Sequence, residues 1–267
     1  MKAYYQNKVA VVTGGASGIG LGLCELLLSF DAKAVVMADV NAANLTRECA
    51  RLEAAYPGKV LGVRTDVTKQ AEVAALMRRA AAFGGGRIDI LFNNAGLGLM
   101  KPFDQTTDED WGRAFAINFY GALYGIRAVL PIMRAQGGGQ IANTASGIGF
   151  LPMPYQTMYS ATKAALIGLT GSLRAELWDE NIRLNTVIPG TVATAIWQGK
   201  APSFAITPEA SACGILKGLA ANERVVFVTD DDRDGAANIT RPEAAAAMDE
   251  YFLGVARRRR SGETGAL

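Results

Sequence analysis

Hydrophobic and polar positions form two alternating patterns along this chain. Short runs rich in β-branched residues, such as 9–13 and 34–38, are each followed by a longer amphipathic stretch rich in Ala and Leu. Short apolar runs of this kind predict the strands of a parallel sheet, and the longer stretches predict the helices between them. Strands are expected at 9–13, 34–38, 60–64, 88–92, 140–144, 183–188 and 225–228, and helices at 21–30, 42–56, 71–83, 111–136, 158–178 and 209–219.

Seven strands alternating with helices predict an α/β fold. The expected architecture is a doubly wound, mainly parallel seven-stranded sheet with helices on both faces. A length of 267 residues fits one domain spanning 1–267, and no repeat or linker marks a second one. Residues 229–267 are expected to form a C-terminal extension, a loop followed by a helix over about 242–255.

Composition narrows the function classes. The chain contains no histidine, which excludes an imidazole metal site and a Ser-His-Asp triad, and its three cysteines lack CxxC spacing. The net charge of +2 does not favour nucleic acid or an anionic membrane. No apolar run approaches the roughly 18 residues of a membrane span. We therefore expect a cytoplasmic protein that acts on a small molecule and binds neither nucleic acid nor membranes.

Two charged segments near the C-terminus have simple interpretations. Asp230, Asp232, Asp234 and Gly235 match positions of a calcium loop, but Arg241 stands where a bidentate Glu is required, so no metal site is expected. The run 257–260 is all arginine and ends the last predicted helix, where cations suit the helix dipole. We expect these arginines to be solvated.

A glycine-rich turn connects the first predicted strand to the first predicted helix. Its sequence over 13–20 is TGGASGIG, with GxxxGxG spacing. Glycines let a ligand approach the backbone, and the amides at a helix N-terminus favour a pyrophosphate. The sequence therefore predicts a dinucleotide site, contacted by Gly14, Ser17, Gly18, Ile19 and Gly20.

Acidic residues follow the second and third strands. Asp39 lies 19 positions after Gly20, close to the spacing of an acid that binds a ribose 2′-hydroxyl. A carboxylate there repels a 2′-phosphate, so NAD is favoured over NADP, with a plain turn or helix-capping role as the alternative. Asp66 and Val67 are expected to contact the adenine, although Asp66 is as well explained as a cap.

A tyrosine and a lysine share one face of the predicted helix 158–178. Tyr159 and Lys163 are four positions apart, which alone predicts only a surface pair. Ser146 follows the strand ending at Thr144, at the sheet edge where ligands of open α/β folds bind. Because Ser146 is expected at this edge as well, Tyr159 and Lys163 become candidates for proton transfer.

Several motifs in this order resemble the short-chain dehydrogenase/reductase family from about residue 8 to residue 194. They are TGGASGIG at 13–20, NNAG at 93–96, Asn118, Ser146, Tyr159 with Lys163, and Pro189-Gly190 followed by Thr194. The resemblance implies a Rossmann-type fold and an NAD-dependent oxidoreductase that interconverts a secondary alcohol and a ketone. It also implies further cofactor contacts at Asn93, Ala95, Gly96, Tyr159, Lys163, Pro189, Gly190, Val192 and Thr194.

The resemblance also implies the catalytic roles. Tyr159 is the general acid/base, Ser146 binds the reacting oxygen, Lys163 binds the nicotinamide ribose, and Asn118 supports a water-linked proton relay. A tyrosine pKa near 10 must fall by about 3 units to serve near neutral pH. A lysine ammonium and an oxidised nicotinamide, both positive, are expected to lower it.

The expected substrate pocket is apolar. Residues 191–207 are expected to form a lid, and few charges occur in the loops around the site, so a hydrophobic alcohol or ketone is favoured. Ordinary core packing is the alternative for each of these side chains. The expected pocket residues are Leu97, Ile148, Phe150, Met153, Tyr155, Ile196 and Trp197.

Other functions stay open at this stage. They are an NADPH-dependent carbonyl or acyl-carrier ketoreductase, disfavoured by Asp39, and a catalytically weak NAD(H)-sensing protein, disfavoured by the intact Ser-Tyr-Lys set. A nucleotide-sugar epimerase shares the Tyr-Lys pair, but too little chain is left for its larger substrate domain. The C-terminal extension differs from the segment that builds a tetramer in many members of the resembled family, so a monomer and a homodimer are as open as a homotetramer.

Overall fold

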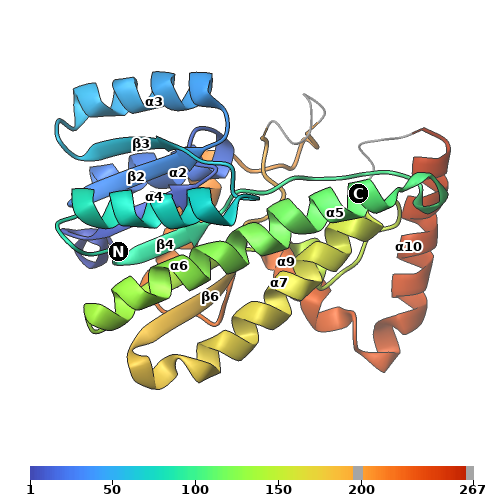
Figure 1. The fold of residues 1–267 in the computed structure, drawn as a ribbon. Helices are drawn as coiled ribbons and strands as arrows, with labels where there is room; N and C mark the ends of the chain where they lie inside the picture. Colours follow the sequence, from blue (N-terminus) through green and yellow to red (C-terminus); the bar gives the residue numbers. More distant parts are fainter. Residues whose placement is uncertain (195–200, 263–267) are drawn as a thin grey trace.

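The computed structural model describes residues 1–194 and 201–262. Within them, seven strands form one parallel sheet in the order β3-β2-β1-β4-β5-β6-β7, which confirms the predicted Rossmann-type sheet (Figure 1). Its strand order reverses between β1 and β4, the place where open α/β folds bind ligands. The strands are β1 Val9–Thr13, β2 Ala34–Asp39, β3 Val60–Arg64, β4 Ile90–Asn93, β5 Gly139–Thr144, β6 Ile182–Ile188 and β7 Val225–Phe227.

Helices cover both faces of the sheet, as the pattern predicted. Each main helix falls within a few residues of its expected range. The helices are α1 Lys2–Tyr5, α2 Gly18–Ser29, α3 Ala42–Ala55, α4 Gln70–Phe83, α5 Asp108–Phe115, α6 Gly121–Ala135, α7 Thr157–Glu176, α8 Pro208–Ala220, α9 Asp230–Asn238 and α10 Ala245–Arg260. Short helical turns are η1 Phe103–Gln105, η2 Ala116–Tyr120, η3 Gly147–Gly149, η4 Trp178–Glu180 and η6 Pro242–Ala244.

Alternation along the strands divides the core into two layers. On β2, Val35 and Met37 pack under α2, α3 and α8, whereas Val36 and Ala38 pack under α4 and α6. Successive side chains of a strand point to opposite faces, so a strand buried on both sides is apolar at every position. This explains why the strands appear in the sequence as unbroken apolar runs.

Three segments differ from the sequence prediction. No element was predicted before the strand at 9–13, but the N-terminus forms α1, whose Tyr5 is fully buried and donates a hydrogen bond to the Leu216 carbonyl at 2.6 Å. The predicted helix 111–136 is divided by η2, a π-helical turn. The loop expected after β7 is the helix α9, which begins with three aspartates in its first turn, where negative charge is favoured.

One helical stretch has the length and composition of a membrane span. Among the described residues it covers Asp108–Ala135, within which an 18-residue window has a mean hydropathy of 1.3. In this fold its α6 part places Ile126, Val129 and Met133 in the core beneath the sheet. The apolar character of α6 is therefore explained by packing on the sheet.

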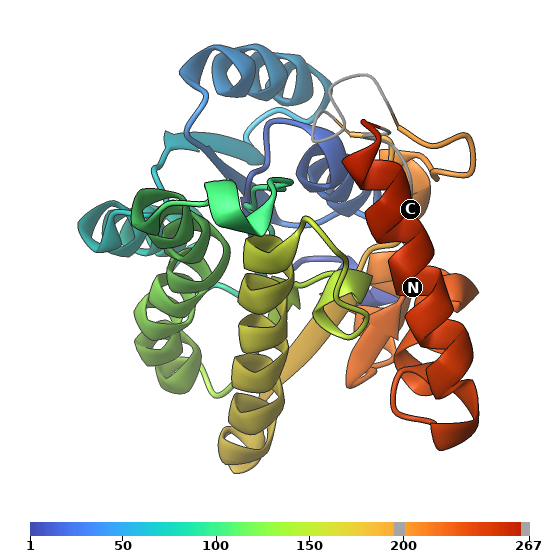
Figure 2. The same cartoon turned by 90° about the vertical axis from the view of Figure 1, so that its right-hand side faces the viewer.

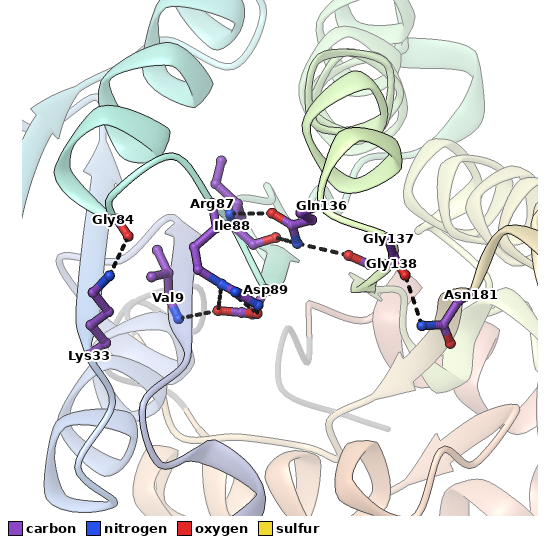
Figure 3. A network of polar contacts seen from close by, with 10 residues as sticks. All are labelled: Val9, Lys33, Gly84, Arg87, Ile88, Asp89, Gln136, Gly137, Gly138 and Asn181. Atoms are coloured by element: carbon purple, nitrogen blue, oxygen red, sulfur yellow. Dashed lines mark hydrogen bonds and ion pairs between the residues drawn. The ribbon is translucent and has the colours of Figure 1, made fainter.

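A polar network fastens the amino-terminal edge of the sheet, opposite the ligand edge (Figure 3). The Asp89 carboxylate accepts a hydrogen bond from the Val9 N–H at 2.8 Å and pairs with Arg87. Gln136 binds both backbone groups of Ile88, at 3.0 and 2.7 Å. Because these contacts link β1 and β4 at one edge, they also fix the relative position of the two strands at the ligand edge.

The C-terminal extension lies at one side of the sheet. In Figure 1, α9 and α10 are on the opposite side of the molecule from α3, and in Figure 2 α10 runs along the face turned to the viewer. Packing places Val255 of α10 in a fully buried position. The extension is thus part of the folded domain, next to the loops that follow β5 and β6.

Candidate active site

The glycine-rich turn between β1 and α2 is tightly closed. Gly14 and Gly18 adopt positive φ angles of 65° and 50°, and a Cβ on Gly20 would lie 2.1 Å from the Gly14 carbonyl oxygen. The first N–H groups of a helix have no intrahelical partner, and Ser17 at the N-cap makes no side-chain capping bond. Gly14, Ser17, Gly18, Ile19 and Gly20 therefore form a cradle that fits a pyrophosphate.

Asp39 lies beside that turn at the end of β2. Its Oδ2 accepts a hydrogen bond from the Ala16 N–H at 3.2 Å, and its Oδ1 accepts one from the Asn41 N–H at 2.9 Å. The N-cap of α3 is Asn41, whose side chain accepts from the Asn44 N–H. Asp39 is thus not the helix cap, and its half-buried carboxylate is held against the glycine-rich turn.

Asp66 is engaged within its own loop. Its Oδ1 accepts hydrogen bonds from the Thr68 N–H at 2.9 Å and the Thr68 hydroxyl at 2.7 Å, which lower the pKa of Asp66. Neighbouring Val67 packs where a side chain on Gly121 would stand, 3.0 Å from its Cβ position. An adenine contact from this loop stays a prediction.

The loop after β4 is fastened to the end of β1. The Thr13 hydroxyl accepts hydrogen bonds from the N–H groups of Asn94 and Ala95, at 3.0 and 3.1 Å. The Asn93 side chain is buried and donates to the Asn143 side chain and to the Ala122 carbonyl. Its amide thus links β4 to β5 and α6. Ala95 and Gly96 are left at the ligand edge, beside the glycine-rich turn.

Ser146, Tyr159 and Lys163 meet at the carboxyl end of β5. Ser146 and Tyr159 line the same cavity, and the Ser146 hydroxyl is near enough to lower the pKa of the Tyr159 phenol. The Lys163 Nζ lies 5.6 Å from the Tyr159 ring centroid and donates to the Thr144 carbonyl oxygen at 2.7 Å. The first turns of α7 therefore place both of their candidate groups over the strand end that carries Ser146.

Burial dominates the titration of these groups. It raises the pKa of Tyr159, and the hydrogen bond from Ser146 offsets this only in part. Burial also lowers the pKa of Lys163 to about 8. In the protein alone the pKa of Tyr159 is thus raised, because burial disfavours the charged phenolate, and the lowering expected with an oxidised nicotinamide bound stays a prediction.

Asn118 lies inside the π-helical turn η2, a local geometry often found at functional sites. Its Oδ1 accepts a hydrogen bond from the Leu97 N–H at 2.8 Å, and its Nδ2 donates to the Leu97 carbonyl at 2.9 Å and to the Thr162 hydroxyl at 3.1 Å. Asn118 thus fastens the loop after β4 to α7. Its role in a proton relay stays a prediction.

The loop after β6 runs between the glycine-rich turn and the segment that follows β7. Gly190 has a φ of 83°, and a Cβ there would lie 2.9 Å from the Thr229 methyl group. Val192 pairs with Ile206 in a parallel bridge, and the Thr194 methyl group is 3.1 Å from the Cβ position of Gly18. Residues 195–200 of the expected lid lie outside the described residues, and Ile196 and Trp197 are among them.

A cavity of about 690 Å³ opens between these loops. Of the expected pocket residues, Ile148 and Met153 line it, whereas Leu97, Phe150 and Tyr155 are not among the lining residues. Phe150 packs against Phe227 with ring centroids 5.9 Å apart. The cavity is lined by Ile19, Gly98, Leu99, Met100, Ser146, Gly147, Ile148, Leu151, Met153, Gln156, Tyr159, Pro189, Gly190, Thr191, Val192, Thr194, Phe204, Ile206, Thr229, Asp231, Asp232, Gly235, Tyr251 and Arg259.

The C-terminal extension supplies a polar wall that sequence reasoning missed. Thr229, Asp231, Asp232 and Arg259 line the cavity, so the pocket is not uniformly apolar as expected. Arg259 was expected to be solvated, but it is 9% exposed and donates a hydrogen bond to the Pro154 carbonyl. No local pattern marks these positions, because their contacts come from packing of distant segments.

Comparisons with known proteins agree with this geometry. The family model described as short chain dehydrogenase matches residues 8–203. A galactitol 2-dehydrogenase of Agrobacterium fabrum is 35% identical over 252 residues, covering 92% of this chain and 93% of that protein. A D-beta-hydroxybutyrate dehydrogenase of Rhizobium meliloti is 34% identical over 205 residues, covering 75% and 78%. A crystal structure of a short chain dehydrogenase/reductase from Burkholderia phymatum in complex with NAD superposes with a TM-score of 0.83 at 28% identity, covering 91% of this chain and 95% of that one.

Proposed function

The chain belongs to the short-chain dehydrogenase/reductase family, and from this premise we propose that it is an NAD-dependent enzyme that interconverts a secondary alcohol and a ketone. The observation that carries the proposal is the meeting of Tyr159 and Ser146 on the wall of one cavity, with the Lys163 ammonium 5.6 Å from the centre of the tyrosine ring. These groups line or border a cavity next to a turn that fits a pyrophosphate. Their arrangement supports proton transfer at a carbon–oxygen bond.

The proposed cofactor site follows the ligand edge of the sheet. The glycine-rich turn would hold the pyrophosphate, Asp39 the adenosine ribose, and the loops 93–96 and 189–194 the nicotinamide half. NAD rather than NADP is supported by Asp39, because its hydrogen bonds hold a negative charge beside the turn and a 2′-phosphate placed there would be repelled. When bound, the nicotinamide would supply the hydride acceptor or donor and, when oxidised, a positive charge.

The chain's own residues handle the proton. In the direction of alcohol oxidation, Tyr159 as a phenolate takes the substrate's hydroxyl proton and becomes a phenol, and in the reverse direction the phenol gives its proton to the ketone oxygen. Ser146 donates a hydrogen bond to the same substrate oxygen and stabilises its developing negative charge. Lys163 is fixed by the Thr144 carbonyl, so its ammonium acts on the tyrosine from one position.

The proposal is tested by Tyr159→Phe, which removes the proton-transferring oxygen and leaves the ring. With NAD and a panel of secondary alcohols, kcat is expected to fall about 10³-fold while NADH binding, followed by its fluorescence, is unchanged. The matched control is Tyr56→Phe, the same chemical change just after α3, away from the cavity. Near-normal turnover by Tyr159→Phe would contradict the proposed mechanism.

Location and assembly are proposals of the same kind. A cytoplasmic enzyme that forms a homodimer or homotetramer is expected. Cell fractionation and light scattering of the purified protein test the two points separately.

A further inference from the structure

Two hydrogen-bond acceptors line the cavity without a role in the proposed proton transfer. The Oε1 atom of Gln156 is buried and has no hydrogen-bond partner among the described residues. Gln156 precedes α7 and lines the same cavity as Tyr159. Buried polar atoms are nearly always paired, so an unpaired one in a side chain that lines a cavity points to a ligand that draws the amide towards the cavity.

The second acceptor comes from the C-terminal extension. Asp232 of α9 lines the cavity, and its Oδ2 accepts a hydrogen bond from the Thr229 hydroxyl at 3.0 Å. Its Oδ1 lies 1.9 Å from the place where a Cβ on Gly147 would stand, so the carboxylate packs directly on the backbone next to Ser146. Burial raises the pKa of Asp232, as expected for a carboxyl group held in a partly dry wall.

The chemistry of the wall selects the ligand group. The Gln156 oxygen needs a donor and the Asp232 carboxylate can accept a further hydrogen bond, and a purely apolar substrate or a carboxylate offers neither group a donor. An ammonium group donates too, but it has no acceptor for the amide N–H groups of Gln156. A hydroxyl group is uncharged, so neither the Asp232 carboxylate nor the Arg259 guanidinium repels it. It also donates and accepts hydrogen bonds, so it satisfies the Gln156 amide in either orientation.

We propose that Gln156 and Asp232 form a hydroxyl-binding subsite beside Ser146, and that the substrate is a polyhydroxylated alcohol or its keto form. The inference rests on the proposed dehydrogenase function and replaces the apolar substrate expected from sequence. The remaining lining, with Leu99, Met100 and Ile148, packs against the carbon chain. The carbon that is oxidised lies at Ser146 and Tyr159, and a further hydroxyl lies at the subsite.

Substrate preference tests the subsite directly. Galactitol, sorbitol and xylitol represent polyols, hexan-2-ol a single alcohol of similar chain length, and 3-hydroxybutyrate an anionic alcohol. With NAD, kcat/KM for at least one polyol is expected to exceed that for both other classes by about tenfold or more. A preference for hexan-2-ol or 3-hydroxybutyrate would overturn the subsite and leave the dehydrogenase proposal intact.

Variants separate recognition from general damage. Gln156→Met and Asp232→Ala are each expected to lower kcat/KM for the preferred polyol at least about tenfold more than for hexan-2-ol. The control is Asp234→Ala, an exposed carboxylate of the same helix that does not line the cavity. Equal losses on both substrates would overturn the proposal.

Binding without turnover distinguishes the two proposals. Polyol binding to the Tyr159→Phe enzyme in the presence of NAD is measured by calorimetry, with and without Gln156→Met. If the polyol binds and Gln156→Met weakens it about tenfold or more, the subsite stands even when no alcohol is turned over by the wild-type enzyme. If no polyol binds, the subsite is wrong, whatever the enzyme oxidises.

Discussion

Asn118 holds Leu97 by both of its backbone groups, accepting from the N–H at 2.8 Å and donating to the carbonyl at 2.9 Å. Leu97 follows the NNAG motif, and the other amide hydrogen of Asn118 reaches Thr162 at 3.1 Å. Thr162 stands directly before Lys163 on α7. The buried Asn118 side chain thus sets the distance between the loop after β4 and the part of α7 that carries Lys163.

Asn118→Ala should therefore weaken both folding and catalysis. It leaves the Leu97 N–H and carbonyl without their partners, so the free energy of unfolding in urea should fall by about 2 kcal/mol. Because the loop and α7 lose their link, kcat should fall about 10- to 100-fold. Asn118→Asp is the informative companion, since it keeps the acceptor but turns an oxygen towards the Leu97 carbonyl. Full activity in Asn118→Ala would show that the link is only structural.

Asp39 should control the choice of cofactor. Asp39→Ser combined with Val40→Arg removes the negative charge and adds a cation at an exposed position next to it. The ratio of kcat/KM for NADP to that for NAD is expected to rise about 100-fold. Asp39→Asn removes the charge but keeps only one of the two oxygens that accept from the Ala16 and Asn41 N–H groups, so its smaller effect on cofactor choice is read together with its stability in urea. A wild-type enzyme that prefers NADP would contradict this assignment and favour the ketoreductase alternative.

Much of this fold could be predicted because its signals are local and repeated. Each strand is a short apolar run, and each helix between strands is a longer amphipathic stretch. The pattern alone therefore locates β1 to β7 along the chain. The i, i+4 spacing of Tyr159 and Lys163 likewise fixes their common helix face. Such features need no knowledge of tertiary packing.

The polar wall could not be predicted, because it depends on contacts between distant segments. Asp232 reaches Gly147 across 85 positions of sequence, and Arg259 reaches the Pro154 carbonyl across 105. The acidic run at 230–234 has a local calcium-like pattern that is unrelated to these contacts. The effect of burial on the Tyr159 pKa in the protein alone could not be predicted either, since desolvation depends on how deeply α7 is covered.

Lys163→Met should stabilise the protein while it removes activity. Burial lowers the pKa of Lys163 to about 8 in the folded state, whereas an unfolded lysine titrates near 10.5. The cost of the buried ammonium is therefore full below pH 8 and disappears as the pH rises from 8 to 10.5. After the lost bond to Thr144 is counted, the variant should gain about 2 kcal/mol in free energy of unfolding at pH 7.

The pH dependence of that gain is the decisive measurement. Urea unfolding of wild type and Lys163→Met is compared at pH 7 and at pH 9.5, and the advantage of the variant should shrink at the higher pH. An exposed lysine, Lys69, provides the control as Lys69→Met, for which no such trend is expected. An advantage that stays constant with pH would show that Lys163 is not a buried cation at pH 7.

Gly147 and Asp232 should be coupled in a way that a double-mutant cycle can measure. A methyl group added by Gly147→Ala would lie 1.9 Å from Oδ1 and 2.9 Å from Cγ of Asp232, but 3.7 Å from its Cβ. Gly147 does not have a positive φ, so the backbone accepts alanine and the clash is with the carboxylate alone. In wild type, Gly147→Ala should lower the free energy of unfolding by about 1–3 kcal/mol, whereas after Asp232→Ala it meets only ordinary contacts.

The four proteins of this cycle are compared by urea unfolding, and a coupling energy of about 1–2 kcal/mol is expected. Gly112→Ala, where an added Cβ meets nothing within 4 Å, should be additive with Asp232→Ala. Coupling with Gly147 and additivity with Gly112 together locate the carboxylate against the backbone beside Ser146. If both cycles are additive, the Asp232 carboxylate lies elsewhere in solution, and the hydroxyl subsite loses the geometry on which it rests.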